Sequence, residues 1–250
     1  MRDTDEPDRR RTIRIATAAW AIPKASASRF PPGESALERY AGVFDAVEIN
    51  TTFYRSHRPS TYQRWAAATP DGFSFAVKVP KAVTHEAGLR DCDALIDGFL
   101  KETAEFGPKR GPILLQLPPK LAFDADLAGP VCDRLVQDGL SPVVCEPRHP
   151  SWFAPAVDHW LAERRVARVA ADPARHPGAD RPGGWRGLSY YRLHGSPRIY
   201  YSEYGEEALS RWSARIAEDP APAAWCVFDN TALGAATADA LDIKKKLSRA

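Results

Sequence analysis

The stretch LSYYRLH, from Leu188 to His194, is a hydrophobic run that carries an arginine and ends on a histidine. Alternate side chains of a β-strand lie on one face, so Tyr190, Arg192 and His194 share a face, and the tyrosine and leucine between them share the other. A guanidinium and an imidazole do not pack easily against helices. We therefore expect a strand whose polar face points inward, or toward one open end of a sheet.

Seven more runs of this kind occur along the chain, and most of them stop on a charged or amide residue. Helix-length stretches separate them, and strands that alternate with helices pair in parallel through right-handed crossovers. A chain of 250 residues has the length of a (β/α)8 barrel. The sequence predicts an α/β fold, a single-domain (β/α)8 TIM-type barrel. The other runs are TIRIATA (12–18), AVEIN (46–50), FSFAVK (73–78), PILLQ (112–116), PVVCE (142–146), VARVAAD (166–172) and WCVFD (225–229), and helices are expected at 35–43, 60–68, 92–106, 127–138, 155–164, 206–218 and 237–247.

Composition and charge narrow the class of protein. The highly charged residues 1–11 predict a disordered N-terminal tail before one domain at 12–250. No stretch reads as a signal peptide and none is apolar for long enough to span a bilayer, so we expect a cytoplasmic protein with no membrane partner. The net charge of +2 gives no bulk attraction to nucleic acid. Composition and charge do not indicate the oligomeric state.

Four motifs point to a known family. VEINTTFYR (47–55), CEPRHPSWF (145–153), YYRLHGSPR (190–198) and VFDNTA (227–232) resemble, in order, the YecE-like family, which is also called domain of unknown function 72. The resemblance covers nearly the whole chain and implies a TIM-type barrel, but it implies no reaction. One departure is visible at ATAAW (16–20), where the family's first strand usually ends in a turn like Gly-Thr-Ser-Gly-Trp.

Carboxylates and a histidine at the strand ends are the catalytic candidates. Barrels of this type place their chemistry at the carboxyl ends of the strands. Charges of both signs buried near one another shift each other's pKa values, and sites use such shifts to make acids and bases usable near neutral pH. Glu48 and Glu146 are the expected acid and base. The catalytic set is Glu48, Glu146, His194 and Asp229.

A second set of residues predicts an anionic ligand. Arg192 can grip two oxygens at once, and it is expected to keep the neighbouring His194 neutral, while Gly195 would let a ligand approach the backbone. A sugar phosphate or a nucleotide-like molecule would suit such a site. The expected ligand-binding residues are Trp20, Asn50, Tyr54, Lys78, His85, Gln116, Arg148, Asp172, Arg192 and Asn230.

Three alternatives stay open at this point. Glu146, Asp172, His194 and Asp229 could hold a divalent metal, as in barrels of the endonuclease IV and xylose isomerase type, although Arg148 and Arg192 oppose a cation there. A basic rim could bind nucleic acid, which is not the favoured reading. The barrel could also bind a ligand without catalysis. No cofactor is predicted, because glycine-rich phosphate loops are absent from the sequence, and a hydrolase, a lyase or an isomerase would all fit these residues.

Overall fold

The computed structural model describes residues 11–249. The charged tail predicted for residues 1–11 therefore lies outside the described residues, apart from Arg11. The Arg11 Nε donates a hydrogen bond to the carbonyl of Ala221 at 2.8 Å.

The strands form the closed wall of a barrel, and every pairing in this wall is parallel. Around the barrel the order is β1, β2, β3, β4, β5, β6 with β7, β9 and β10, which returns to β1. A bridge between Ala18 and Glu48 joins β1 to β2. Only Val169 separates β6 from β7; β6 pairs with β5, and β7 pairs with β9. The predicted single-domain TIM-type fold is confirmed, and its strands are β1 (Thr12–Thr17), β2 (Ala46–Ile49), β3 (Ser74–Lys78), β4 (Arg110–Gln116), β5 (Val143–Glu146), β6 (Val166–Arg168), β7 (Ala170–Asp172), β9 (Ser189–Leu193) and β10 (Ala223–Phe228).

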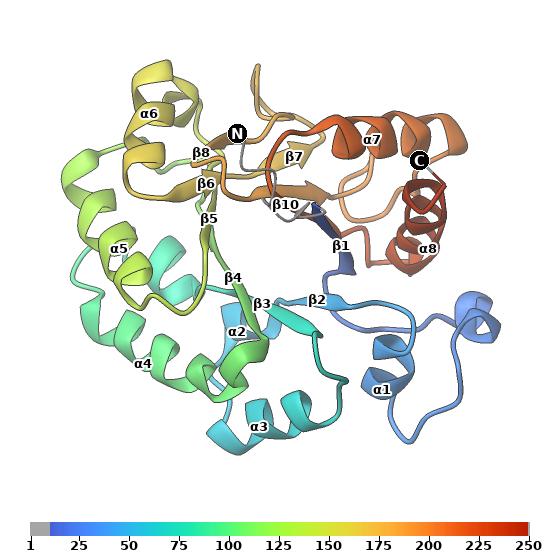
Figure 1. The fold of residues 1–250 in the computed structure, drawn as a ribbon. Coiled ribbons are helices and arrows are strands. Elements are labelled where there is room, and N and C mark those ends of the chain that lie inside the picture. The colour runs from blue at the N-terminus through green and yellow to red at the C-terminus, as the bar shows by residue number, and fades with distance from the viewer. Residues whose placement is uncertain (1–10, 250) are drawn as a thin grey trace, which may run out of the picture.

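Helices surround this wall (Figure 1). Each of the seven predicted helices is present, and sequence signals fix two of their starts. Ser35 Oγ accepts a hydrogen bond from the Glu38 N–H, and the Asp124 carboxylate accepts from Asp126 and Leu127. The helices are α1 (Ala36–Ala41), α2 (Thr51–Tyr54), α3 (Pro59–Ala67), α4 (Asp93–Thr103), α5 (Ala125–Gln137), α6 (Pro155–Glu163), α7 (Glu206–Glu218) and α8 (Ala235–Leu247), with a π-helical turn at Ala82–Glu86.

The sixth crossover departs from the regular pattern. Residues 173–188, all of which the structure describes, contain no helix. The segment instead adds the short strand β8 (Gly183–Gly184), which pairs antiparallel with β6. Asp158 on α6 holds both elements, because its Oδ1 accepts from the Gly184 N–H and from the Arg168 Nε, each at 2.9 Å.

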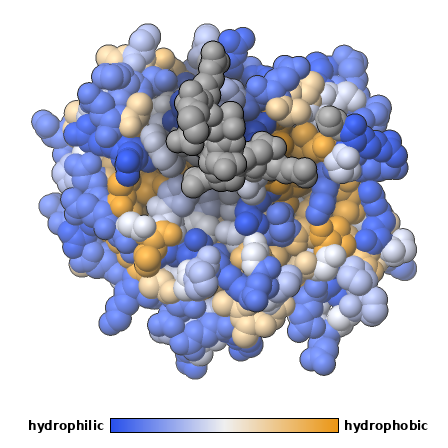
Figure 2. All heavy atoms as spheres, in the orientation of Figure 1, coloured by the Kyte–Doolittle hydropathy of each residue, from blue (hydrophilic) through white to orange (hydrophobic). Residues whose placement is uncertain are grey.

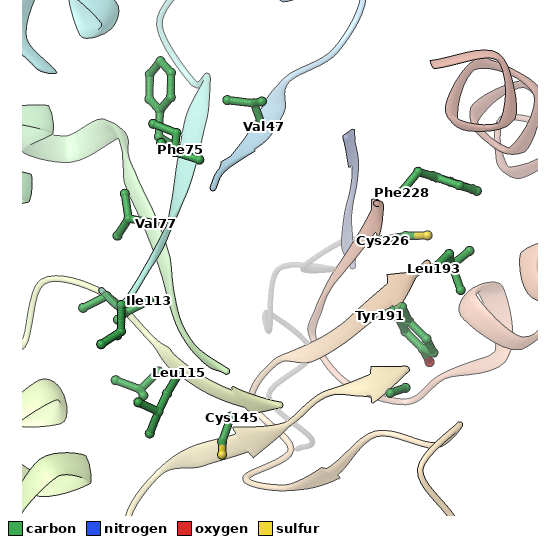
Figure 3. Packing of buried hydrophobic residues seen from close by; sticks show 14 of the residues in the cluster. Val47, Phe75, Val77, Ile113, Leu115, Cys145, Tyr191, Leu193, Cys226 and Phe228 are labelled. Atoms are coloured by element: carbon green, nitrogen blue, oxygen red, sulfur yellow. The ribbon is translucent and has the colours of Figure 1, made fainter. Parts of the chain in front are cut away.

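The core has two layers that follow the period of two along the strands. Side chains such as Val47, Val77, Tyr191 and Leu193 point away from the barrel axis toward the helices (Figure 3). The inward positions form a separate cluster, in which the Tyr190 ring stacks on Trp225 with centroids 5.9 Å apart. The predicted split between the two faces of β9 is confirmed. The inner cluster is otherwise rich in small residues, among them Ala16, Ala18, Ala46, Ala76 and Ala167.

The surface is mostly hydrophilic on the face shown in Figure 2, and hydrophobic residues gather farther in between the outer elements. Among residues 11–249 no helix combines the length and the apolar character that a membrane crossing requires.

Candidate active site at the barrel mouth

Arg192 is the centre of a buried charged cluster at the carboxyl ends of the strands. Its side chain is 0% exposed. Its Nη2 donates to Glu48 Oε1 at 2.7 Å and to Asp229 Oδ2 at 2.9 Å, its Nε donates to Glu48 Oε2 at 3.1 Å, and its Nη1 donates to Glu146 Oε2 at 2.6 Å. One guanidinium thus binds three carboxylates from β2, β5 and the end of β10.

Small residues on β1 allow this arrangement. Arg192 lies on β9, and Glu48 lies on β2, so the side chain must pass β10 and β1 inside the barrel. Ala16 on β1 and Ala18, one residue past its end, belong to the inward cluster and leave room for the long arginine. Tyr190, one inward position before Arg192, completes the contact, because its hydroxyl donates to Glu48 Oε2 at 2.8 Å.

His194 lies between two of the same carboxylates. Its Nδ1 is 3.0 Å from Asp229 Oδ2, and its Nε2 is 3.2 Å from Glu146 Oε1. Burial disfavours the charged ring, but the Glu146 charge and the two hydrogen bonds outweigh burial and raise the pKa of His194. The expectation that Arg192 keeps this imidazole neutral is wrong, because the carboxylates on both sides favour the imidazolium.

The same contacts also shift the pKa values of the carboxylates. Burial tends to raise the pKa of Glu146, but Arg192, His194 and Arg148 together hold it well below its usual range. The pKa of Asp229 is also lowered, since Arg192 and His194 outweigh its burial. Asn50, the residue after β2, also contributes, with its Nδ2 3.4 Å from Asp229 Oδ1.

Lys78, at the end of β3, has a different environment. It is 8% exposed, and its Nζ lies 4.2 Å from the centroid of the Phe53 ring. No acceptor within residues 11–249 lies within hydrogen-bond distance of this nitrogen. Its pKa is therefore set by burial and by ions that lie farther away. Burial and, next, Arg192 lower the pKa of Lys78 to about 8, against the opposing pull of the carboxylates.

His85 lies close enough to Lys78 and to Arg148 for both charges to act on it. The His85 ring packs edge-on against Phe53, at 5.0 Å between centroids. Burial lowers the pKa of His85 first, and the positive charges of Lys78, Arg148 and Lys120 lower it further. Positive potential therefore gathers on this side of the mouth.

Gln116 and Arg148 lie at the ends of the next two strands: Gln116 is the last residue of β4, and Arg148 follows the end of β5 by two residues. Gln116 is 6% exposed and lies in register with Glu146. The Arg148 Nε and Nη2 donate to Glu146 Oε1 at 3.2 and 3.1 Å, and Nη2 also lies 3.4 Å from the Tyr200 hydroxyl. Within the described part of the chain, neither the Gln116 amide nor the Arg148 Nη1 has a hydrogen-bond partner.

Two expected roles do not fit this geometry. Arg192 cannot grip an external anion as predicted, because its nitrogens are turned to three carboxylates and its side chain is fully buried. Glu48 is equally enclosed, at 0% exposed, between Arg192 and the Tyr190 hydroxyl. Both residues are buried beneath the site and support it from inside the barrel.

Four predicted residues lie outside the cluster. Asp172 accepts a hydrogen bond from the Tyr204 hydroxyl at 2.7 Å instead of turning toward His194. Asn230 is 0% exposed and donates to Asp239 and to the Ser202 carbonyl. The remaining two are aromatic: Trp20 packs against Trp65 on α3, with centroids 5.0 Å apart, and Tyr54 is 71% exposed beside Phe53.

The reason why position 195 needs a glycine also differs from the expected one. Its φ is +92°, and a Cβ there would lie 2.6 Å from the carbonyl oxygen of Ser202. Glycine is therefore required by the close return of the protein's own loop, and not by the approach of a ligand.

The four proposed metal ligands do not fit a metal ion. The Arg192 guanidinium lies between Glu146 and Asp229, and Asp172 is bound to Tyr204. No group of three or more His, Cys, Asp or Glu side chains in residues 11–249 is arranged to hold one. Arg186 lies away from the mouth, because it pairs with Asp219, which precedes β10 and so lies at the opposite end of the barrel.

Two members of the site were missing from the predicted set. Tyr190 supports Glu48, and Phe53 holds Lys78. The period of two already placed Tyr190 on the face of Arg192, so that signal was present in the sequence. No sequence signal placed the Phe53 ring under Lys78.

These features define an α/β barrel of the TIM type with a charged site at the carboxyl ends of its strands. The chain belongs to the family described as protein of unknown function DUF72, whose model matches residues 14–250. It is 34% identical over 166 residues to the UPF0759 protein YecE of Escherichia coli, a match that covers 64% of this chain and 59% of that protein. The UPF0759 protein YunF of Bacillus subtilis is 26% identical over 166 residues, which are 62% of this chain and 57% of that one. The chain thus spans less than two thirds of the length of these curated relatives.

Solved structures show the same fold. A DUF72 family protein of Enterococcus faecalis superposes with a TM-score of 0.79 at 19% identity, over 95% of this chain and 96% of that one. A DUF72 family protein of Thermotoga maritima gives 0.76 at 22% identity, over 95% and 99% of the two chains. A D-psicose 3-epimerase gives 0.52 at 11% identity, over 85% and 90%, which shows likeness of fold alone.

Proposed function

We propose that the protein is an enzyme that binds a small anionic molecule, such as a sugar phosphate, at the barrel mouth and acts on it by proton transfer. One observation carries the proposal. Lys78 and Gln116 end the neighbouring strands β3 and β4, Arg148 lies two residues past the end of β5, and each has a nitrogen donor without an acceptor in residues 11–249. In residues 11–249 none of these three nitrogens is among the fully enclosed atoms that lack a partner. They therefore reach the open mouth, where an anionic ligand could accept hydrogen bonds from all three.

The balance of charge supports an anion. Glu48, Glu146 and Asp229 are already bound by Arg192 and His194. The ammonium of Lys78 and the guanidinium of Arg148 then add positive charge, which acts together on His85. A phosphate would gain charge-assisted hydrogen bonds from these groups.

Glu146 and His194 are the proposed acid/base pair. They are in contact at 3.2 Å, and their pKa values are driven apart in the directions that favour a carboxylate and an imidazolium. Such pairs divide the roles of proton acceptor and donor in many enzymes. Glu48 is not in this pair, because Arg192 and Tyr190 enclose it.

Calorimetric titration with inorganic phosphate and with ribose 5-phosphate tests the binding. Lys78→Met and Arg148→Gln should each weaken binding at least about tenfold, which corresponds to a loss of about 1.4 kcal/mol. Affinity for phosphate should also fall as the pH rises through about 8, where Lys78 loses its proton. Lys81→Met is the matched control, since Lys81 pairs with Glu86 on the neighbouring turn. Unchanged affinity in Lys78→Met would contradict the site.

Isotope exchange tests the chemistry. The carbon-bound hydrogens of dihydroxyacetone phosphate should exchange in deuterated water with the protein present, and Glu146→Gln should remove the exchange. Phosphate binding without exchange would favour a ligand-binding barrel that is not catalytic.

A further inference from the structure

Lys78 is unusual among buried lysines because no carboxylate of residues 11–249 pairs with it. Lysines are almost never buried unless paired, yet this Nζ lies over the face of the Phe53 ring, 4.2 Å from its centroid. The Nζ is not among the fully enclosed polar atoms that lack partners, so it keeps access to the mouth. It is carried by the last residue of β3, a rigid element, which fixes its direction.

We propose that Lys78 forms an imine with an aldehyde or ketone that also carries an anionic group. The inference rests on the proposed function, because Arg148 and Gln116 would hold the anionic group while the amine meets the carbonyl. It adds the substrate class, an anionic carbonyl compound, and a covalent step.

The amine must be neutral to react, and its surroundings favour this. With a pKa of about 8, about a tenth of the Lys78 side chains are uncharged at pH 7. A lysine desolvated in an apolar pocket, or placed near another cation, is a known way to activate this nucleophile. Here both causes act, since burial comes first and Arg192 second.

The step balances as follows. The Nζ lone pair forms a bond to the carbonyl carbon, and the π electrons move to the oxygen, which takes up a proton while the nitrogen loses one. The resulting carbinolamine then takes a second proton on its hydroxyl and loses water as the C=N bond forms. Neutral amine, carbonyl and one proton thus give an iminium ion and one water.

The neighbouring groups suit each part of this step. His85 touches the same Phe53 ring as Lys78, and its lowered pKa keeps it neutral and able to accept the proton that the nitrogen loses. The iminium ion stays cationic, so the Phe53 face continues to stabilise it. The carboxylates of Glu48, Glu146 and Asp229 also favour positive charge on this nitrogen.

Reductive trapping tests the inference. The protein is incubated with glycolaldehyde phosphate and cyanoborohydride, and the modified lysines are identified by peptide mass spectrometry. Lys78 should be modified at least about tenfold faster than the exposed Lys81, and inorganic phosphate should suppress the reaction at Lys78 alone. Lys81 serves as an internal control, because it lies three residues away and its Nζ is paired with Glu86 at 2.8 Å.

The outcomes separate this inference from the proposed function. Equal modification of Lys78 and Lys81, or none at Lys78, overturns the imine even where titration shows that phosphate binds normally. Absence of phosphate binding in the same titration overturns the proposed anion site instead. In Lys78→Met, a retained melting temperature together with loss of the fast-reacting site supports the imine.

Discussion

Arg192 is the residue on which the interior of the barrel depends. Its guanidinium and the Glu48 carboxylate are both fully buried, and desolvation of such ions is costly unless every partner is in place. Three carboxylates and the Tyr190 hydroxyl meet that need here. The residue is therefore a support for the site and not a contact for the ligand.

Replacement of Arg192 should destabilise the protein. Arg192→Met leaves three carboxylates near one another without their cation, and breaking a buried pair in this way typically costs about 3–5 kcal/mol. Urea denaturation should show this loss of unfolding free energy. Arg192→Lys should show much of it as well, since a single ammonium cannot reach three partners with the geometry of a guanidinium.

A second substitution separates charge from packing. Adding Glu48→Gln to Arg192→Met removes one uncompensated charge and should restore a part of the lost stability. If the double variant is less stable than Arg192→Met alone, repulsion among the carboxylates is not the cause of the effect.

The sequence predicted the direction of Arg192 but not its partners. The period of two showed that Tyr190, Arg192 and His194 share an inward face. Which opposite wall the arginine reaches depends on the alanines of β1 and on closure of the barrel, and neither is encoded near residue 192. For the same reason Lys78 was predicted among several cations, and only the fold shows that no acceptor of residues 11–249 lies within hydrogen-bond distance of its Nζ.

At the scale of elements, the end of β1 carries backbone strain. Ala19 has a φ of +90°, in the left-handed region that favours glycine. This is the position at which the sequence ATAAW departs from the Gly-Thr-Ser-Gly-Trp-like turn of the family. The Ala19 N–H still donates to the Glu48 carbonyl at 2.9 Å, so the turn is kept despite the side chain.

Ala19→Gly should therefore stabilise the protein. Relief of the left-handed conformation contributes about 1–2 kcal/mol, and the greater freedom of glycine in the unfolded chain offsets about 0.4–1 kcal/mol of it. A net gain of about 1 kcal/mol corresponds to a rise of about 2–4 °C in melting temperature for a chain of this size. Ala21→Gly, at a nearby exposed residue with negative φ, should give no gain, and an equal gain there would argue against strain at Ala19.

The loop after β9 is fastened by a carboxylate on α8. Asp239 Oδ2 accepts from the Tyr204 N–H at 3.1 Å and from the Asn230 Nδ2 at 2.7 Å. Burial raises the pKa of Asp239 to about 6, since its hydrogen bonds only partly offset the loss of water. The charged form is thus less favourable in the folded protein than in the unfolded chain.

The sign of the pH dependence follows from that shift. Stability from this group is greatest below about pH 4, where both states hold the proton, and it is lost as the pH rises to about 6. Asp239→Asn keeps an oxygen acceptor and removes the charge, so at pH 8 it should gain roughly 1–2 kcal/mol, after allowance for partial solvent screening. Thermal unfolding from pH 4 to pH 8 should show that the gain shrinks in acid, and a constant difference would contradict this origin.

The sixth crossover contains a strand pairing that the sequence pattern did not predict. No helix was predicted between the runs 166–172 and 188–194, and the described residues there contain none. The antiparallel pairing of β8 with β6 was not predictable, because it depends on Asp158 and Arg168, which meet the segment only in the folded protein.

At the scale of the whole molecule, repetition made the fold predictable. Eight apolar runs in a chain of 250 residues define the barrel even where a single run is ambiguous. The carboxyl ends of parallel strands meet, so the polar residues that close the runs had to meet as well. Asp172 and Asn230 were the exceptions, because Tyr204 in the loop after β9 and Asp239 on α8 form hydrogen bonds with their side chains.

The contact between Arg192 and Glu48 joins residues that are 144 positions apart. A barrel cut between β4 and β5 would leave Glu48 and Lys78 on one fragment, and Arg192 with Glu146 and Asp229 on the other. Each fragment would have to bury ions whose partners it lacks, so neither should fold by itself. The molecule is therefore an indivisible folding unit, and two such fragments should recover native structure only when they are mixed.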